Sequence, residues 1–201
     1  MLKLVLKKRD LLFTVGAAFL ITIFLTPTFK NLGLYDKIPY PNIVIFALFP
    51  IVTIVGMLVA SFVGRYMAIL WQITKFGLVG VLNTVIDFGV LNFLITLTGI
   101  QAGLAIVPLN VTSFTLATVN SYFWSKNWVF VGSKSSKFIA FLVVSVLGIL
   151  LNTAVVFTLT TFIAPPGQMS PTVWANAAKV LATLMSLVWN FLGYKLVVFK
   201  K

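Results

Sequence analysis

The second half of the chain repeats one pattern, and this repeat limits the possible fold more than any other feature. A Lys-Phe pair opens a long apolar run at residue 75 and again at residue 137, and a second apolar run follows each. These second runs end in similar phrases, NSYFWSKNWVF at 120–130 and NFLGYKLVVF at 190–199. A duplicated helix pair with lysines at both ends predicts a symmetric helical bundle in a membrane.

The composition indicates that lipid surrounds this chain. Hydrophobic residues make up 60% of it and charged residues only 9%, and the mean hydropathy is +1.09. A soluble domain needs about 25% charged residues to cover its surface. The chain is therefore expected to be an all-α membrane protein, because a helix satisfies its own backbone hydrogen bonds within lipid.

Six apolar runs have the length of a membrane span, for which about 20 residues suffice. They are 11–29, 43–63, 76–97, 104–124, 138–163 and 173–194. The first run is long and lacks a small-residue cleavage site, so we expect an uncleaved anchor rather than a signal peptide. We expect two parts, an accessory hairpin at 1–70 and a four-helix core at 75–199. Both copies of the repeat begin and end on the same side, as parallel repeats do.

The basic residues predict the orientation of the spans. If the N-terminus is cytoplasmic, twelve basic residues fall on cytoplasmic segments and two, Lys30 and Lys37, on external loops. This bias predicts that both termini are cytoplasmic and that the protein lies in the cytoplasmic (inner) membrane. The basic residues behind the net charge of +12 are therefore explained by the orientation of the spans in the membrane, and we expect no nucleic-acid partner.

The residue types that are missing exclude several classes of site. The chain has no cysteine and no histidine, and its only carboxylates are Asp10, Asp36 and Asp87. Disulfides, thiol nucleophiles, imidazole bases and the usual zinc ligands are thereby excluded. The loops between the spans are short and leave no room for a nucleotide-sugar domain. We expect no cofactor, no metal and no enzymatic activity of the chain alone.

Polar residues recur at helical spacing along four of the spans. The rows are Gly80, Asn83 and Asp87; Asn110, Ser113, Ala117, Asn120 and Trp124; Ser145, Gly148 and Asn152; and Asn176, Lys179, Thr183, Ser186 and Asn190. Polar sides of helices in lipid must face protein or water, so the four rows can converge on one polar interior. The alternative is simple helix adhesion, at about 1 kcal/mol or less for each polar contact.

Asp87 and Lys179 are the most informative of these residues. Asp87 lies about 17 Å into its span, near the midplane, where a carboxylate costs about 2.5–3.5 kcal/mol on insertion scales. Lys179 lies in the outer half of its span, and its side chain can extend inward. Either the two residues form a structural ion pair, or one or both contact a polar cargo, or Asp87 is protonated during turnover.

Two lysines mark the cytoplasmic ends of the repeat. Lys126 and Lys195 lie among aromatic residues and close to Asn120 and Asn190, at matching places in the two copies. Basic and aromatic residues anchor many helices at the membrane interface, which is one interpretation. The other is a headgroup-level site in which two cations bind a lipid phosphate and aromatic faces contact sugar or prenyl groups.

The residues of the repeat resemble the GtrA-like family of small membrane proteins. The resemblance rests on KFGLVGVLNTVIDFGVLN at 75–92, on the phrase at 120–130, and on residues 137–152 and 189–199, and it covers about 75–199. It implies a four-helix bundle, similar to the membrane part of some dolichyl-phosphate-mannose synthases. The family pattern often has asparagine where this chain has Ser125, and the hairpin at 1–70 lies outside the pattern.

The resemblance also implies a function. The proteins that the chain resembles are linked to synthesis of cell-surface polysaccharides, including O-antigen glucosylation. By motif position, the resemblance points to substrate-binding roles for Asn83, Asp87, Asn120, Lys126, Asn190 and Lys195. We add Lys179 as a further substrate-binding candidate. The leading hypothesis is flipping of a polyprenyl-phosphate-linked sugar. The alternatives are a scaffold that recruits a membrane-associated glycosyltransferase, and a small proton-coupled exporter that uses Asp87. A homodimer is compatible with each.

Overall fold

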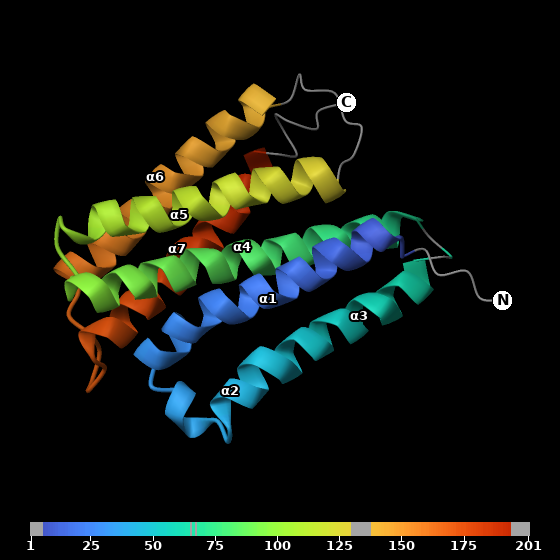
Figure 1. The fold of residues 1–201 in the computed structure, drawn as a ribbon. Coiled ribbons are helices and arrows are strands. Elements are labelled where there is room, and N and C mark those ends of the chain that lie inside the picture. Colours follow the sequence, from blue (N-terminus) through green and yellow to red (C-terminus); the bar gives the residue numbers. More distant parts are fainter. Residues whose placement is uncertain (1–5, 65, 67, 130–137, 194–201) are drawn as a thin grey trace.

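The computed structural model describes residues 6–64, 66, 68–129 and 138–193, and all regular structure in this part of the chain is helical (Figure 1). The elements are α1 (Lys8–Asn31), the short turn η1 (Tyr35–Lys37), a continuous segment of α2 (Pro41–Ile43), η2 (Val44–Leu48) and α3 (Phe49–Gly64), then α4 (Ala68–Thr98), α5 (Ile106–Trp124), the π-helical turn η3 (Ser125–Val129), α6 (Phe138–Phe162) and α7 (Pro171–Gly193). Each of the six predicted runs corresponds to one long helical segment.

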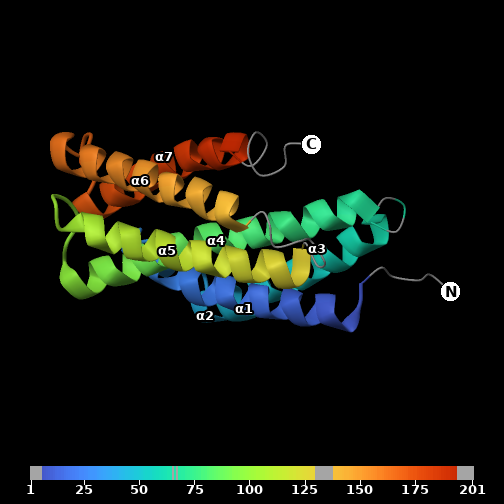
Figure 2. The same ribbon diagram turned by 90° about the horizontal axis from the view of Figure 1, so that it is seen from above.

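The predicted all-α membrane fold is confirmed. Five of the described helical segments are long and apolar enough to cross a membrane. The exception is α5, which carries Asn110, Ser113 and Asn120 and lies beside α4 (Figure 2). The largest difference from the prediction is the start of α4. The expected run was 76–97, but the helix already begins at Ala68, and Trp71 in this added part is buried in the apolar core.

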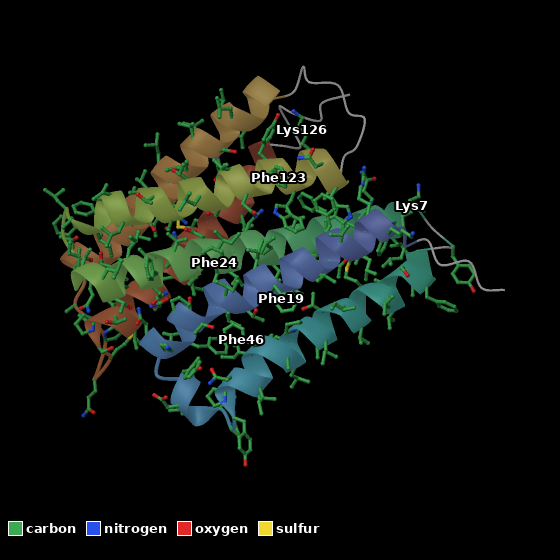
Figure 3. The ribbon with its side chains drawn as sticks, viewed as in Figure 1. Lys7, Phe19, Phe24, Phe46, Phe123 and Lys126 are labelled. Atoms are coloured by element: carbon green, nitrogen blue, oxygen red, sulfur yellow. The ribbon has the colours of Figure 1, made fainter. Side chains whose placement is uncertain are left out.

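The two ends of the bundle differ in character. α1, α4 and α6 begin at one end, and α5 and α7 return to it (Figure 1). This end carries Lys7 and Lys126 (Figure 3), and we call it the lysine end. The opposite end carries the turns between α1 and α2, between α4 and α5 and between α6 and α7, and we call it the loop end. The order of the two helix pairs matches the predicted parallel repeat, whereas the side of the membrane that each end faces stays a prediction.

The N-terminal hairpin packs closely on the four-helix core. Ala17 and Ile21 of α1 share one apolar cluster with Val79, Leu82 and Ile86 of α4. The backbones of the two helices lie close together at Gly89, where an added Cβ atom would clash with the carbonyl oxygen of Phe24. α1 therefore rests on α4 through main-chain contact, and the expected division into 1–70 and 75–199 stays a prediction.

Gly89 is expected to tolerate no side chain. The Gly89→Ala variant would force α1 away from α4, and overpacking of this kind typically costs about 1–3 kcal/mol. Gly77 on the same helix is the matched control, since nothing lies within 4 Å of its added Cβ. Gly77→Ala should be neutral or slightly stabilising, because alanine favours a helix by about 1 kcal/mol over glycine. Thermal unfolding in detergent measures both, and equal midpoints for the two variants would contradict the close contact.

Candidate functional site

An ion pair lies in the interior of the four-helix core. The Lys179 Nζ of α7 lies 2.7 Å from Asp87 Oδ1 of α4, and the two side chains are 0% and 6% exposed. The hydroxyl of Ser113, on α5, also donates to Asp87 Oδ1, at 2.7 Å. The structure thus brings the two charged residues of the predicted polar interior into direct contact.

The remaining donors of Lys179 are directed at asparagines of two other helices. Its Nζ donates to Asn110 Oδ1 of α5 at 2.7 Å and to Asn152 Oδ1 of α6 at 3.2 Å. The Asn110 amide in turn donates to Asn152 Oδ1 and to the Thr153 hydroxyl, both at 3.0 Å. Each of the four core helices therefore contributes at least one polar side chain to this group, which we call the central network.

The central network compensates a large desolvation cost. Removing a carboxylate and an ammonium from water costs several kcal/mol per ion, and mutual attraction offsets this only if the remaining donors and acceptors are satisfied. Here the Lys179 ammonium has carboxylate and amide acceptors, and all of them are buried. On α7, one turn from Lys179, the buried Thr183 hydroxyl oxygen has no hydrogen-bond partner among the described residues.

A second network lies nearer the loop end. The side-chain amides of Asn92, on α4, and Asn176, on α7, donate to each other's oxygens at 2.7 and 2.8 Å. Asn31, at the end of α1, donates to the Asn92 side-chain oxygen at 2.9 Å. We call these three residues the asparagine cluster. The cluster joins the N-terminal hairpin to both halves of the core and closes the polar interior toward the loop end.

Asn83 and Asn120 lie on the other side of the central network, toward the lysine end. The Asn120 amide donates to Asn83 Oδ1 at 2.8 Å, and the contact is only partly buried. Exposure along this side of α4 rises from 4% at Asp87 to 49% at Phe76. α7 also diverges from α4 toward the lysine end (Figures 1 and 2). Within the described residues, the polar interior is therefore less covered at the lysine end than at the loop end.

The lysine-end candidates are placed only in part. Lys126 lies in the π-helical turn η3 and is exposed, and its Nζ is 5.5 Å from the centre of the Tyr122 ring. Asn190 belongs to α7, but its side chain and all of Lys195 lie outside the described residues. The predicted pairing of Lys126 with Lys195 therefore stays a prediction.

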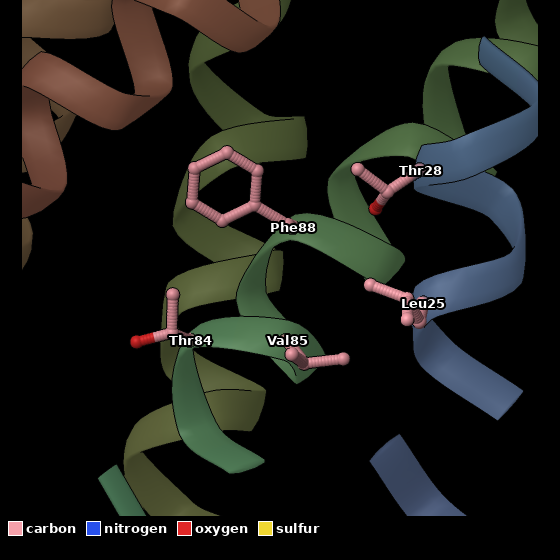
Figure 4. A pocket seen from close by; sticks show the side chains of 5 residues that line it. All are labelled: Leu25, Thr28, Thr84, Val85 and Phe88. Atoms are coloured by element: carbon pink, nitrogen blue, oxygen red, sulfur yellow. The ribbon is translucent and has the colours of Figure 1, made fainter. Parts of the chain in front are cut away.

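Two cavities lie between helices, away from the charged groups. One, of about 190 Å³, is lined by Leu25 and Thr28 of α1 and by Thr84, Val85 and Phe88 of α4 (Figure 4). The other, of about 500 Å³, lies between α6 and α7. Apolar side chains predominate in both linings, so these cavities offer space to hydrocarbon rather than to a sugar.

Sequence reasoning missed part of this arrangement. Asn31 and Asn92 were not among the predicted polar partners, and Asp10 was predicted only as one of three carboxylates. Asn92 follows Asp87 by five residues, which is about 140° around a helix and off the polar row of α4. A search for asparagines on any buried face, rather than on one row, could have found it.

Comparison with known proteins agrees with this architecture. A family model described as "GtrA/DPMS, transmembrane domain" matches residues 75–199. The chain is also 30% identical over 142 residues to a Bacillus subtilis (strain 168) protein named "Uncharacterized membrane protein YngA", a match that covers 68% of this chain and 86% of that protein. No solved structure matches the chain. The chain therefore belongs to the GtrA/DPMS transmembrane-domain family, and it is a multi-pass membrane protein.

Proposed function

We propose that the protein moves a polyprenyl-phosphate-linked sugar across the cytoplasmic membrane. The observation that carries the proposal is the buried pair of Asp87 and Lys179, held by polar groups from all four core helices. Charged residues inside a membrane bundle are costly and rare, and they typically mark a functional site such as a substrate or ion pathway. The likeness of the repeat to proteins of polysaccharide synthesis supports a sugar as the polar cargo.

The parts of the site have distinct tasks in this proposal. Lys126, with Lys195 from the second copy, holds the lipid phosphate at the headgroup level. Asn83 and Asn120 receive the first sugar hydroxyls, and Asn190 lies at the equivalent place in the other half. The prenyl chain stays in the lipid, where apolar helix sides and cavities accept it. The chain acts without a cofactor and performs no covalent chemistry.

Transport requires the central network to open. In this structure the Asp87 and Lys179 side chains bind each other, and in our proposal this pair blocks the path until the two residues separate. Sugar hydroxyls both donate and accept hydrogen bonds, and they can replace the contacts that Asp87 and Lys179 lose when α4 and α7 separate. α7 already diverges from α4 at the lysine end (Figure 2), so cargo enters there and the asparagine cluster opens last.

A complementation experiment in cells tests the proposal. Asp87→Asn, Lys126→Ala and Lys195→Ala are each expected to reduce polysaccharide modification by about tenfold or more, since each removes a charged contact of the kind worth about 1.5–3 kcal/mol. Lys37→Ala, in the exposed turn between α1 and α2, is the matched control and should retain modification. Full modification by all variants at normal expression would overturn the proposed mechanism.

A scaffold for a membrane-associated glycosyltransferase is the second candidate. The observation in its favour is that Lys179 and Asp87 already have protein partners, as a purely structural network would require. This candidate predicts that an exposed lipid-facing surface matters more than Asp87. Tryptophan substitutions at Val52, Val55 and Val59 on α3, which are 50–60% exposed, should then abolish co-purification of the transferase while Asp87→Asn leaves it unchanged.

A further inference from the structure

The N-terminal hairpin contributes a buried carboxylate to the lysine end of the core. Asp10, in the first turn of α1, is 6% exposed. Its Oδ1 accepts a hydrogen bond from the indole Nε1 of Trp128, at 2.8 Å, and lies 3.7 Å from the Nζ of Lys75. Its Oδ2 accepts from the backbone N–H of Lys7, at 2.9 Å. One carboxylate thus joins the start of α1, the lysine-end part of α4 and the turn that follows α5.

Trp128 is the centre of this cluster. It is fully buried, and its ring stacks on Phe13 of α1 with 5.4 Å between centroids and 8° between planes. The ring of Trp124 packs edge-on against the ring of Trp128, with 5.9 Å between the two centroids. The main chain of the turn is held as well, because Lys75 donates to the Trp128 carbonyl and Gln72 to the Val129 carbonyl, both at 3.4 Å.

The held turn is also the turn that presents Lys126. In η3, Trp128 and Val129 are buried, whereas Lys126 and Asn127 are exposed. A π-helical turn shifts the side-chain register of a helix and occurs often at functional sites. Because five consecutive residues share one turn, fixing the buried pair fixes the direction of the exposed pair. By holding Trp128, Asp10 therefore also constrains the position of Lys126 through the backbone of η3.

We infer that Asp10 is a positioning residue for the lysine-end site. The N-terminal hairpin, which lies outside the family pattern, completes this site by anchoring η3 through Asp10 and Trp128. The role of Lys126 in holding a lipid phosphate rests on the proposed function, whereas the anchoring of η3 does not. The hairpin is thus part of the working unit, and without it η3 would keep its contacts with α4 but would lose those of Asp10 and Phe13 with Trp128.

Cysteine labelling tests the anchoring directly, because the natural chain has no cysteine. The reporter is Val129→Cys at a position that is 5% exposed, reacted with a small maleimide in the purified, folded full-length protein. Asp10→Ala is expected to speed labelling about tenfold or more, the factor that corresponds to ~1.4 kcal/mol of lost anchoring. Asp10→Asn keeps an acceptor for the indole and should restore most of the protection.

Two controls separate release of η3 from general loosening. Asp36→Ala removes an exposed carboxylate from the other end of the same hairpin and should leave the reporter slow. Ala117→Cys, at a buried position inside α5, should label equally slowly with and without Asp10→Ala. Unchanged labelling of Val129→Cys in Asp10→Ala would overturn the inference, as would equal acceleration at position 117.

The Trp128→Phe variant identifies the contact through which Asp10 acts. It keeps an aromatic ring against Phe13 but removes the indole donor, so it should accelerate the Val129→Cys reporter as Asp10→Ala does. The double variant should label no faster than the faster single variant, and multiplied effects would contradict a shared contact.

In transport assays, Asp10→Ala should raise the half-saturating substrate concentration more than it lowers the maximal rate. Reporter release without any transport by wild type would refute the proposed function and leave the anchoring intact.

Discussion

The Lys179→Met variant is expected to lose about 3–5 kcal/mol of stability, the cost typical of removing one partner of a buried ion pair. Methionine fills most of the space of the lysine stem, so loss of packing contributes little. The main cause is that the Asp87 carboxylate, 6% exposed, would keep only the Ser113 hydroxyl as a partner within the part of the chain that the structure describes. Asn110 and Asn152 lose the ammonium donor at the same time.

Unfolding of the purified protein in detergent measures this effect. Lys126→Met is the matched control, because it removes an exposed lysine from the same core. Exposed charges contribute about 0–1 kcal/mol at most, so the control should unfold close to wild type. A Lys179→Met protein as stable as this control would mean that the pair is not buried as described.

The double variant Asp87→Asn/Lys179→Gln is expected to recover most of the stability that either single change loses. The two amides can hydrogen-bond to each other and to Ser113 and Asn110, and no uncompensated charge remains in the bundle. Replacing a buried ion pair as a unit is often neutral, whereas breaking it is not. The free energy of unfolding should therefore lie within about 2 kcal/mol of wild type.

The same double variant is expected to be inactive in transport. The proposed mechanism uses the charges of Asp87 and Lys179 to bind cargo when the central network opens, and a neutral amide pair lacks them. A charged hydrogen bond is worth roughly twice a neutral one. The variant thus separates a structural role of the pair, which it preserves, from a transport role, which it removes. Full transport by a stable double variant would assign the pair to structure alone.

The helices and the charged centre were largely predictable from the sequence. Apolar runs of membrane length locate the spans because lipid excludes unpaired backbone groups. The polar rows predicted a shared interior because asparagine and lysine rarely face lipid. Contact between Asp87 and Lys179 was one of three interpretations, since spacing along each helix does not determine which rows meet.

The contacts of the N-terminal hairpin were not predictable in the same way. Asp10 and Trp128 are 118 residues apart, and neither belongs to a polar row. Tryptophan is a residue type that often anchors helices at the membrane interface. The packing of α1 on α4 brings the Trp128 indole to the Asp10 carboxylate. Asn31 was expected in an external loop, but it ends α1 and reaches Asn92. Such pairs depend on the relative rotation of helices, which hydropathy does not determine.

A flipping assay in proteoliposomes tests the central claim most directly. It measures movement of a short-chain polyprenyl-phosphate sugar between leaflets, with wild type, the Asp87→Asn/Lys179→Gln variant and protein-free vesicles side by side. The account predicts that wild type accelerates movement well above protein-free vesicles and that the folded double variant does not. If folded wild type moves no more lipid than empty vesicles do, the protein is not a translocase by itself, and the scaffold function takes its place.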